Sequence, residues 1–177
     1  MKKQTFSVAL GGIVAALSLV CLFLTGVFPF ATYALPALAG VCLILIVIEI
    51  GERWAWLTYA VIALLALILT PDWEAKLLFV AFFGYYPILK ARLERLRPRA
   101  LEWGVKLVVF NTAVIAAYAV LLFVLRLDEV AAEFAGWIGP ALLLGGNVVF
   151  VLYDISLTRL ISTYMWRLRP KLPRNFH

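Results

Sequence analysis

The sequence has few of the residues on which most catalytic sites depend. Histidine occurs once, as the final residue His177, which argues against a histidine-based zinc site or catalytic triad. Cys21 and Cys42 stand in apolar stretches without a CxxC spacing, and we interpret them as small buried side chains. We therefore expect no metal site, no cofactor and no disulfide.

Catalytic motifs are also missing. No glycine-rich loop precedes a lysine, and neither HExxH nor GxSxG occurs. Asp154 is the one ionisable residue well inside an apolar stretch, with Glu49 and Lys106 close to the edges of others. One such group is a functional hypothesis in a membrane segment, but it cannot run a proton relay alone. We expect a protein that is not an enzyme.

Charge is scarce, because 15% of the 177 residues are charged and 65% are hydrophobic, with a mean hydropathy of +1.00. That usage is far from that of a soluble domain. The net charge of +6 could suggest nucleic acid, but the basic residues lie at the edges of apolar stretches instead of forming one patch. The composition therefore indicates a membrane protein with no nucleic-acid partner.

The apolar stretches predict an all-α polytopic membrane protein with one domain over residues 1–177. Most of these runs are long enough to cross a bilayer as helices. The first is too long for the apolar core of a signal peptide. Gly84 and Pro87 predict a kink near the inner end of the fourth. The six expected spans are residues 6–28, 33–50, 54–69, 73–90, 105–125 and 138–161.

A basic segment, residues 89–106, separates the fourth and fifth spans. Its apolar residues recur at helical spacing, which is typical of a helix lying against anionic lipid headgroups. The charges could instead be only a topology signal, or a surface for a partner protein. Short loops rich in lysine and arginine stay in the cytoplasm, so we expect this segment and both termini on the cytoplasmic side of the inner membrane. The segment contains Lys90, Arg92, Arg95, Arg97, Arg99 and Lys106, against Glu94 and Glu102.

The first span carries small residues at the spacing that lets helix backbones approach closely in lipid. They are Gly11, Gly12, Ala15 and Ala16. Such a face packs either within the bundle or against the helix of a partner. The pattern alone does not choose between the two.

Four polar residues occupy the last two spans in pairs seven positions apart, Asn111 with Tyr118 and Asn147 with Asp154. Residues seven apart share a helix face, and polar groups facing lipid are costly. Counting a rise of about 1.5 Å per residue from the inner ends of these spans places Asn111 level with Asp154, and Tyr118 level with Asn147. We expect Asn111 and Asp154 to form a buried structural lock, and Tyr118 and Asn147 to line a ligand pocket.

Two aromatic residues extend this predicted pocket on the outer side. Tyr33, in the short uncharged loop after the first span, is expected to close over it, and Trp137 to stand at its entrance. Trp137 is more typical of an interfacial anchor, since tryptophan is enriched at both faces of membranes.

The expected six spans, the cytoplasmic termini, the small-residue pairs Gly11–Ala15 and Gly12–Ala16, and the aromatic loop at residues 30–33 resemble a known family. It is the S component, the substrate-binding subunit, of energy-coupling factor (ECF) vitamin transporters. In that family an AxxxA pattern on the first helix meets the transmembrane coupling subunit; here glycine replaces the first alanine.

The resemblance implies capture of a vitamin-like solute near the outer surface and docking to a coupling subunit driven by two cytoplasmic ATPases. It also implies toppling of the subunit in the membrane during transport. No vitamin-specific signature is present in the sequence. A non-catalytic scaffolding subunit, similar to the rod-shape-determining membrane proteins of similar size, is the alternative. A ligand-binding protein should gather polar groups in the outer half of the bundle, whereas a scaffold need not.

The distribution of lysine and arginine predicts the orientation of the chain. Reporter fusions at either terminus should be active only as cytoplasmic reporters, because the basic residues concentrate near both termini and in residues 89–106. A periplasmic or extracellular signal from either fusion would contradict this topology.

Overall fold

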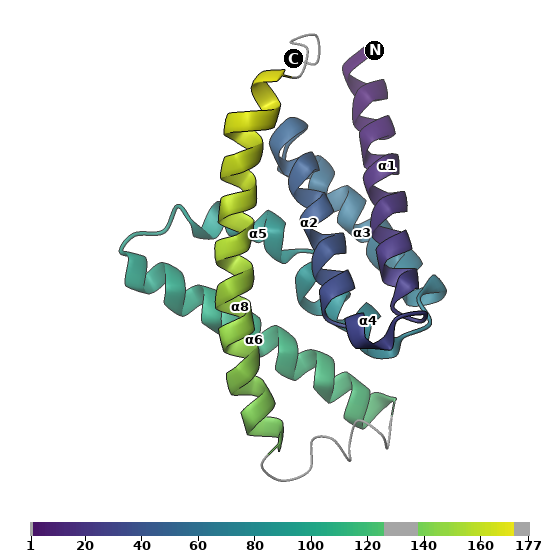
Figure 1. Cartoon of the computed structure of the whole chain (residues 1–177), viewed down its shortest axis with the longest axis vertical. Helices are drawn as coiled ribbons and strands as arrows, with labels where there is room; N and C mark the ends of the chain where they lie inside the picture. The colour runs from purple at the N-terminus through teal and green to yellow at the C-terminus, as the bar shows by residue number, and fades with distance from the viewer. Residues whose placement is uncertain (1, 126–137, 172–177) are drawn as a thin grey trace.

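The computed structural model describes residues 2–125 and 138–171, and all regular structure within them is helical (Figure 1). Short π-helical turns extend α4, α6 and α8, namely η2 (Phe79–Phe83), η3 (Val120–Val124) and η4 (Tyr164–Leu168), and two 3-10 turns are η1 (Pro29–Ala31) and η5 (Arg169–Lys171). The α-helices are α1 (Lys2–Leu24), α2 (Ala34–Glu49), α3 (Glu52–Leu69), α4 (Trp73–Leu78), α5 (Tyr86–Leu93), α6 (Arg99–Ala119) and α8 (Ile138–Thr163).

Four of the described helices are long and apolar enough to cross a membrane, which confirms an all-helical protein of the integral membrane type. They cover Gln4–Leu24, Glu52–Leu69, Arg99–Val124 and Ile138–Arg167. The expected span at residues 33–50 is a shorter apolar helix of 16 residues, and the one at residues 73–90 is interrupted. The start of α1 and the end of α8 lie at the same end of the molecule (Figure 1).

The fourth apolar segment breaks where Gly84 and Pro87 predict a kink. Asp72 begins α4 by accepting hydrogen bonds from the backbone N–H of Glu74 and Ala75, at 2.9 and 3.1 Å. The π-turn η2 follows, and a turn at residues 84–85 separates it from α5. A Cβ on Gly84 would lie 2.6 Å from the ring of Tyr59, so only glycine fits there. Pro87 stands in the first turn of α5, where proline is tolerated.

The first of two hydrophobic cores joins α1, α2 and α3, which lie side by side in Figure 1. Ser18 of α1 donates a hydrogen bond to the carbonyl of Ala39 in α2 over 3.0 Å. Gly40 lets α2 approach the backbone of Phe83, because a Cβ at this position would overlap the Phe83 carbonyl. The central buried side chains of this first core include Val14, Leu22, Leu43, Ile46, Ile62 and Phe79.

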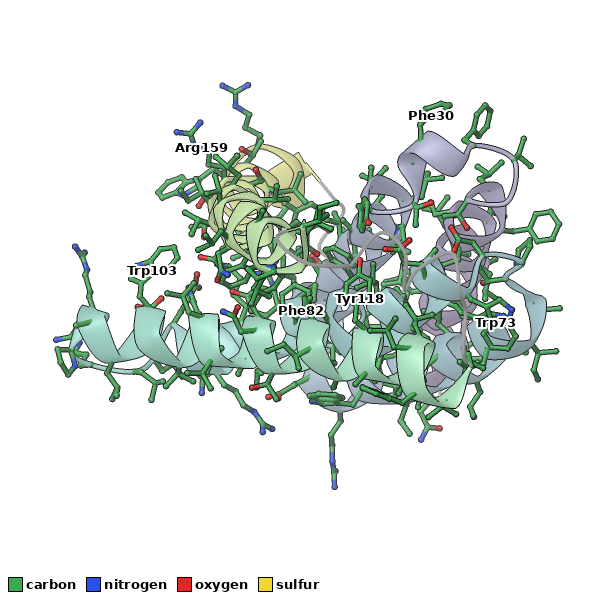
Figure 2. All side chains as sticks on the ribbon, turned by 90° about the horizontal axis from the view of Figure 1, so that it is seen from below. Phe30, Trp73, Phe82, Trp103, Tyr118 and Arg159 are labelled. Atoms are coloured by element: carbon green, nitrogen blue, oxygen red, sulfur yellow. The ribbon has the colours of Figure 1, made fainter. Side chains whose placement is uncertain are left out.

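The second core is aromatic and lies between α2, η2, α5, α6 and α8. The rings of Phe110 and Phe150 stack with centroids 4.7 Å apart and planes 11° from parallel. Phe82 meets both rings edge-on, at 5.2 and 5.6 Å. Figure 2 shows Phe82 on the side of α6 that faces the remaining helices. Figure 1 shows α6 crossing α8 at a wide angle, so these aromatic rings fill the crossing point.

The small residues of α1 differ in their packing: some pack within the bundle, and others are exposed. A Cβ on Gly11 would lie 3.4 Å from Oγ1 of Thr58 in α3, and Ala15 packs against the first core. Gly12 and Ala16 are exposed, and nothing lies within 4 Å of a Cβ on Gly12. Half of this face therefore packs inside the described bundle, and the other half does not.

Candidate functional site

A buried charge cluster joins three helices in the C-terminal half of the protein. It consists of Tyr86 and Lys90 from α5, Lys106 from α6 and Asp154 from α8. Oδ1 of Asp154 lies 2.5 Å from Nζ of Lys90 and accepts a hydrogen bond from the Tyr86 hydroxyl over 2.6 Å. Oδ2 lies 3.0 Å from Nζ of Lys106. Each of the four residues is at most 3% exposed.

Two further carboxylates pair with the lysines. Glu94 contacts Nζ of Lys90 at 2.8 Å, and Glu102 contacts Nζ of Lys106 at 2.7 Å. Glu94 is 38% exposed at its side chain and Glu102 15%, so this side of the cluster leads toward the surface. Every buried side-chain nitrogen and oxygen of the described residues has a hydrogen-bond partner. An apolar protein tolerates buried charges only when they are paired and hydrogen-bonded in this way.

The role of the two lysines was not predicted from the sequence, because both were interpreted as parts of the basic segment. A signal was nevertheless present in their spacing. Tyr86, Lys90 and Glu94 are four residues apart, as are Glu102 and Lys106, so each set lies on one helix face. Two such faces next to a helix that carries a lone Asp154 indicate an ion cluster.

The predicted pairs of polar residues in the last two spans are wrong. Asn111 pairs with Asn147, not with Asp154: their amides exchange hydrogen bonds of 2.8 and 3.0 Å. Each amide also donates to the carbonyl four residues earlier in its own helix, over 2.8 Å. Asn147 is therefore placed as a structural contact between α6 and α8, away from Tyr118. Asp154 is buried and hydrogen-bonded as expected, but with different partners.

The pairing failed because the inner end of the fifth span was taken at residue 105, whereas α6 begins at Arg99. Counted from Arg99, Lys106 lies seven residues along α6, and Asp154 lies seven residues before the expected inner end of the last span at 161. At about 1.5 Å per residue the two are level. Asn111 and Asn147 are 12 and 14 residues from the same ends, which makes them near neighbours. The depth count also treats the two helices as antiparallel neighbours, whereas α6 crosses α8 at a wide angle (Figure 1).

A second group of polar side chains, the Glu74 cluster, consists of Tyr33, Glu74 and Tyr118. Oε1 of Glu74 accepts hydrogen bonds from the hydroxyl of Tyr33 over 2.7 Å and from that of Tyr118 over 2.5 Å. The two hydroxyl oxygens are 3.3 Å apart. Figure 2 shows Tyr118 on the side of α6 that faces the other helices. The structure thus brings two predicted pocket residues together, on a carboxylate that the prediction did not include.

Neighbouring contacts fix the loops around the Glu74 cluster. Thr32 donates to Oδ2 of Asp72 over 2.9 Å, which ties the loop after α1 to the cap of α4. Lys76, two residues from Glu74, is buried and directed elsewhere: its Nζ lies 3.6 Å from the centroid of the Trp73 ring and 3.4 Å from the carbonyl of Leu67. Predicted Trp137 lies outside the described residues.

The two clusters offer different chemistry. The buried charge cluster satisfies its own groups and ties helices together. In the Glu74 cluster a carboxylate, which only accepts hydrogen bonds, stands beside two hydroxyls, which donate and accept. Among the described residues no group of three or more histidine, cysteine or acidic side chains could hold a metal ion.

The amide pair predicts a coupled loss of stability. Asn111→Ala and Asn147→Ala should each lower the free energy of unfolding in detergent by about 1 kcal/mol, because each removes the two hydrogen bonds between the amides. The double variant should cost clearly less than the sum. Ser156→Ala removes a hydroxyl that bonds only within α8, to the Leu152 carbonyl, and should change little. Additive losses would show that the two amides do not interact.

Comparison of the chain with protein-family models, with curated proteins and with solved structures finds no match in any of the three. A function for this protein is therefore drawn from its own residues.

Proposed function

We propose that this protein is the membrane-embedded substrate-binding subunit of an ECF-type importer, with six transmembrane segments and both termini in the cytoplasm. It captures a vitamin-like small solute on the outer side of the inner membrane. It then docks to a transmembrane coupling subunit that two cytoplasmic ATPases drive. The observation that carries this proposal is the convergence of three separate elements on the carboxylate of Glu74.

The position of the Glu74 cluster suits a solute site. Helix α4, which carries Glu74, lies near the end of α1 that is far from the N-terminus (Figure 1). With the termini in the cytoplasm, that end faces outward. Tyr33 comes from the loop after α1 and Tyr118 from the far part of α6, so a solute held here would contact three elements.

The chemistry of the Glu74 cluster selects a type of solute. Small-molecule sites use a few placed polar groups among apolar and aromatic side chains. A carboxylate flanked by two phenol rings favours a solute with an amine or another hydrogen-bond donor, since the carboxylate only accepts. Binding would exchange one or both tyrosine contacts of Glu74 for contacts with the solute.

The exposed half of the small-residue face supports docking to a partner helix. Gly12 and Ala16 are exposed, and large apolar side chains flank them on α1: Val8 is 62% exposed and Ile13 65%. Small residues let a second backbone approach closely in lipid, where van der Waals packing drives helix association. This surface would receive the coupling subunit, as the AxxxA face does in S components.

A non-catalytic scaffolding subunit is the second candidate. The fully paired charge cluster favours it, because a network without an unsatisfied buried group stabilises a bundle without needing a ligand. Such a subunit would use the exposed face of α1 for assembly and would carry no solute at Glu74.

Purification of the tagged chain from its native membrane tests the proposal. The wild-type protein should bring down two ATPases and a coupling subunit, together with a small molecule detectable by mass spectrometry after denaturation. Glu74→Gln should retain these proteins and lose most of the solute, by about tenfold, because one charged hydrogen bond is removed. Gly12→Leu should retain the solute and lose the ATPases.

Gly104→Leu is the matched control for Gly12→Leu. Gly104 is an exposed glycine of α6 with nothing within 4 Å of a Cβ. The Gly104→Leu variant should therefore retain both the solute and the ATPases. Isolation of the wild-type chain with neither ATPases nor a solute would contradict the transporter proposal. Co-purification of partner proteins without a solute, to the same extent in the wild type and in Glu74→Gln, would favour the scaffold.

A further inference from the structure

A groove outside the Glu74 cluster opens on the first two turns of α3. It is largely open, and it is lined by four residues of this one helix, Arg53, Trp54, Trp56 and Leu57. Leu57 is 61% exposed, so one side of the groove faces outward from the bundle. Helix α3 is one of the four helices long enough to cross a membrane, and the groove lies at its N-terminal end.

The apolar walls of the groove are held in place by neighbouring side chains. The indole N–H of Trp56 donates to Oε1 of Glu52 over 3.3 Å, and its ring stacks on Tyr85 with planes 14° apart and centroids at 6.5 Å. Tyr59 meets the same ring edge-on at 5.8 Å. Trp54 packs against the first core. Neighbouring residues thus hold both tryptophans of the groove in place.

The charge on the rim of the groove is positive and uncompensated. The nearest acidic residue, Glu52, is already bound: Arg92 of α5 lies 2.5 Å from its Oε1, which also receives Trp56. Arg53 is exposed, and it has no ion pair with any residue in the described ranges. The ion pair of Glu52 with Arg92 also brings the basic segment next to the groove, which adds positive potential.

We propose that this groove binds one anionic phospholipid, with its phosphate on Arg53 and an acyl chain against the tryptophans and Leu57. The chain would continue along the exposed apolar face of α3, where Val61 is 50% and Leu64 66% exposed. An amphiphile matches an apolar wall with a single cation at its rim, because burial of the chain and the charge contact act together. Free phosphate would leave the apolar wall unused. The site is separate from the proposed solute site.

Native mass spectrometry of the full chain in detergent, with equal amounts of phosphatidylglycerol and phosphatidylcholine, tests this proposal. The wild-type protein should retain one phosphatidylglycerol in preference to phosphatidylcholine. Arg53→Gln should lower that retention by about fivefold, since one basic residue is removed from the lipid surface. Arg53→Lys, which keeps the charge, should retain most of the lipid.

A matched variant separates the groove from a general effect of charge. Arg159 projects from α8 away from the body of the molecule (Figure 2). Arg159→Gln should leave retention within twofold of the wild type. Equal retention of the two lipids would overturn the proposal. So would an Arg53→Gln variant that binds like the wild type, or a loss in Arg159→Gln as large as that in Arg53→Gln.

Discussion

A carboxylate held between two lysines inside an apolar helical protein is the interaction on which the C-terminal half depends. Asp154 of α8 contacts Lys90 of α5 and Lys106 of α6, and all three are almost fully buried. Separating α8 from the other two helices would leave Asp154 without a counterion, which is strongly destabilising in an apolar interior. The cluster therefore holds α5 and α6 against α8, next to the aromatic core.

The interrupted fourth segment connects this cluster to the rest of the molecule. Its π-turn gives Phe79 to the first core and Phe82 to the second, so one short element joins the two. Its first part carries Glu74 and its last part carries Lys90. A solute that binds at Glu74 would act on the same segment that the buried charge cluster fixes at its other end.

The lengths of the apolar runs predict the class of the protein and the positions of much of its helical structure. The residues Gly84 and Pro87 predict the kink. The register between α6 and α8 could not be predicted, because it depends on a helix start at Arg99 inside a charged stretch. The burial of Lys90 and Lys106 was equally hidden, since lysines at a membrane edge usually mark topology. Which small residues of α1 pack inside the bundle also needed the fold, because a small-residue pattern is the same for internal and external packing.

A double-mutant cycle on Lys90 and Asp154, measured as the free energy of unfolding in detergent, tests the central interaction most directly. Lys90→Met and Asp154→Leu should each cost about 3 kcal/mol, because each breaks the buried Lys90–Asp154 ion pair and leaves its charged groups with fewer partners. The double variant should cost less than the sum by at least about 2 kcal/mol. Glu102 continues to pair with Lys106 in all variants, which keeps the cycle interpretable. Single losses below about 0.5 kcal/mol, or strictly additive ones, would contradict a buried charge cluster that holds α8 in place.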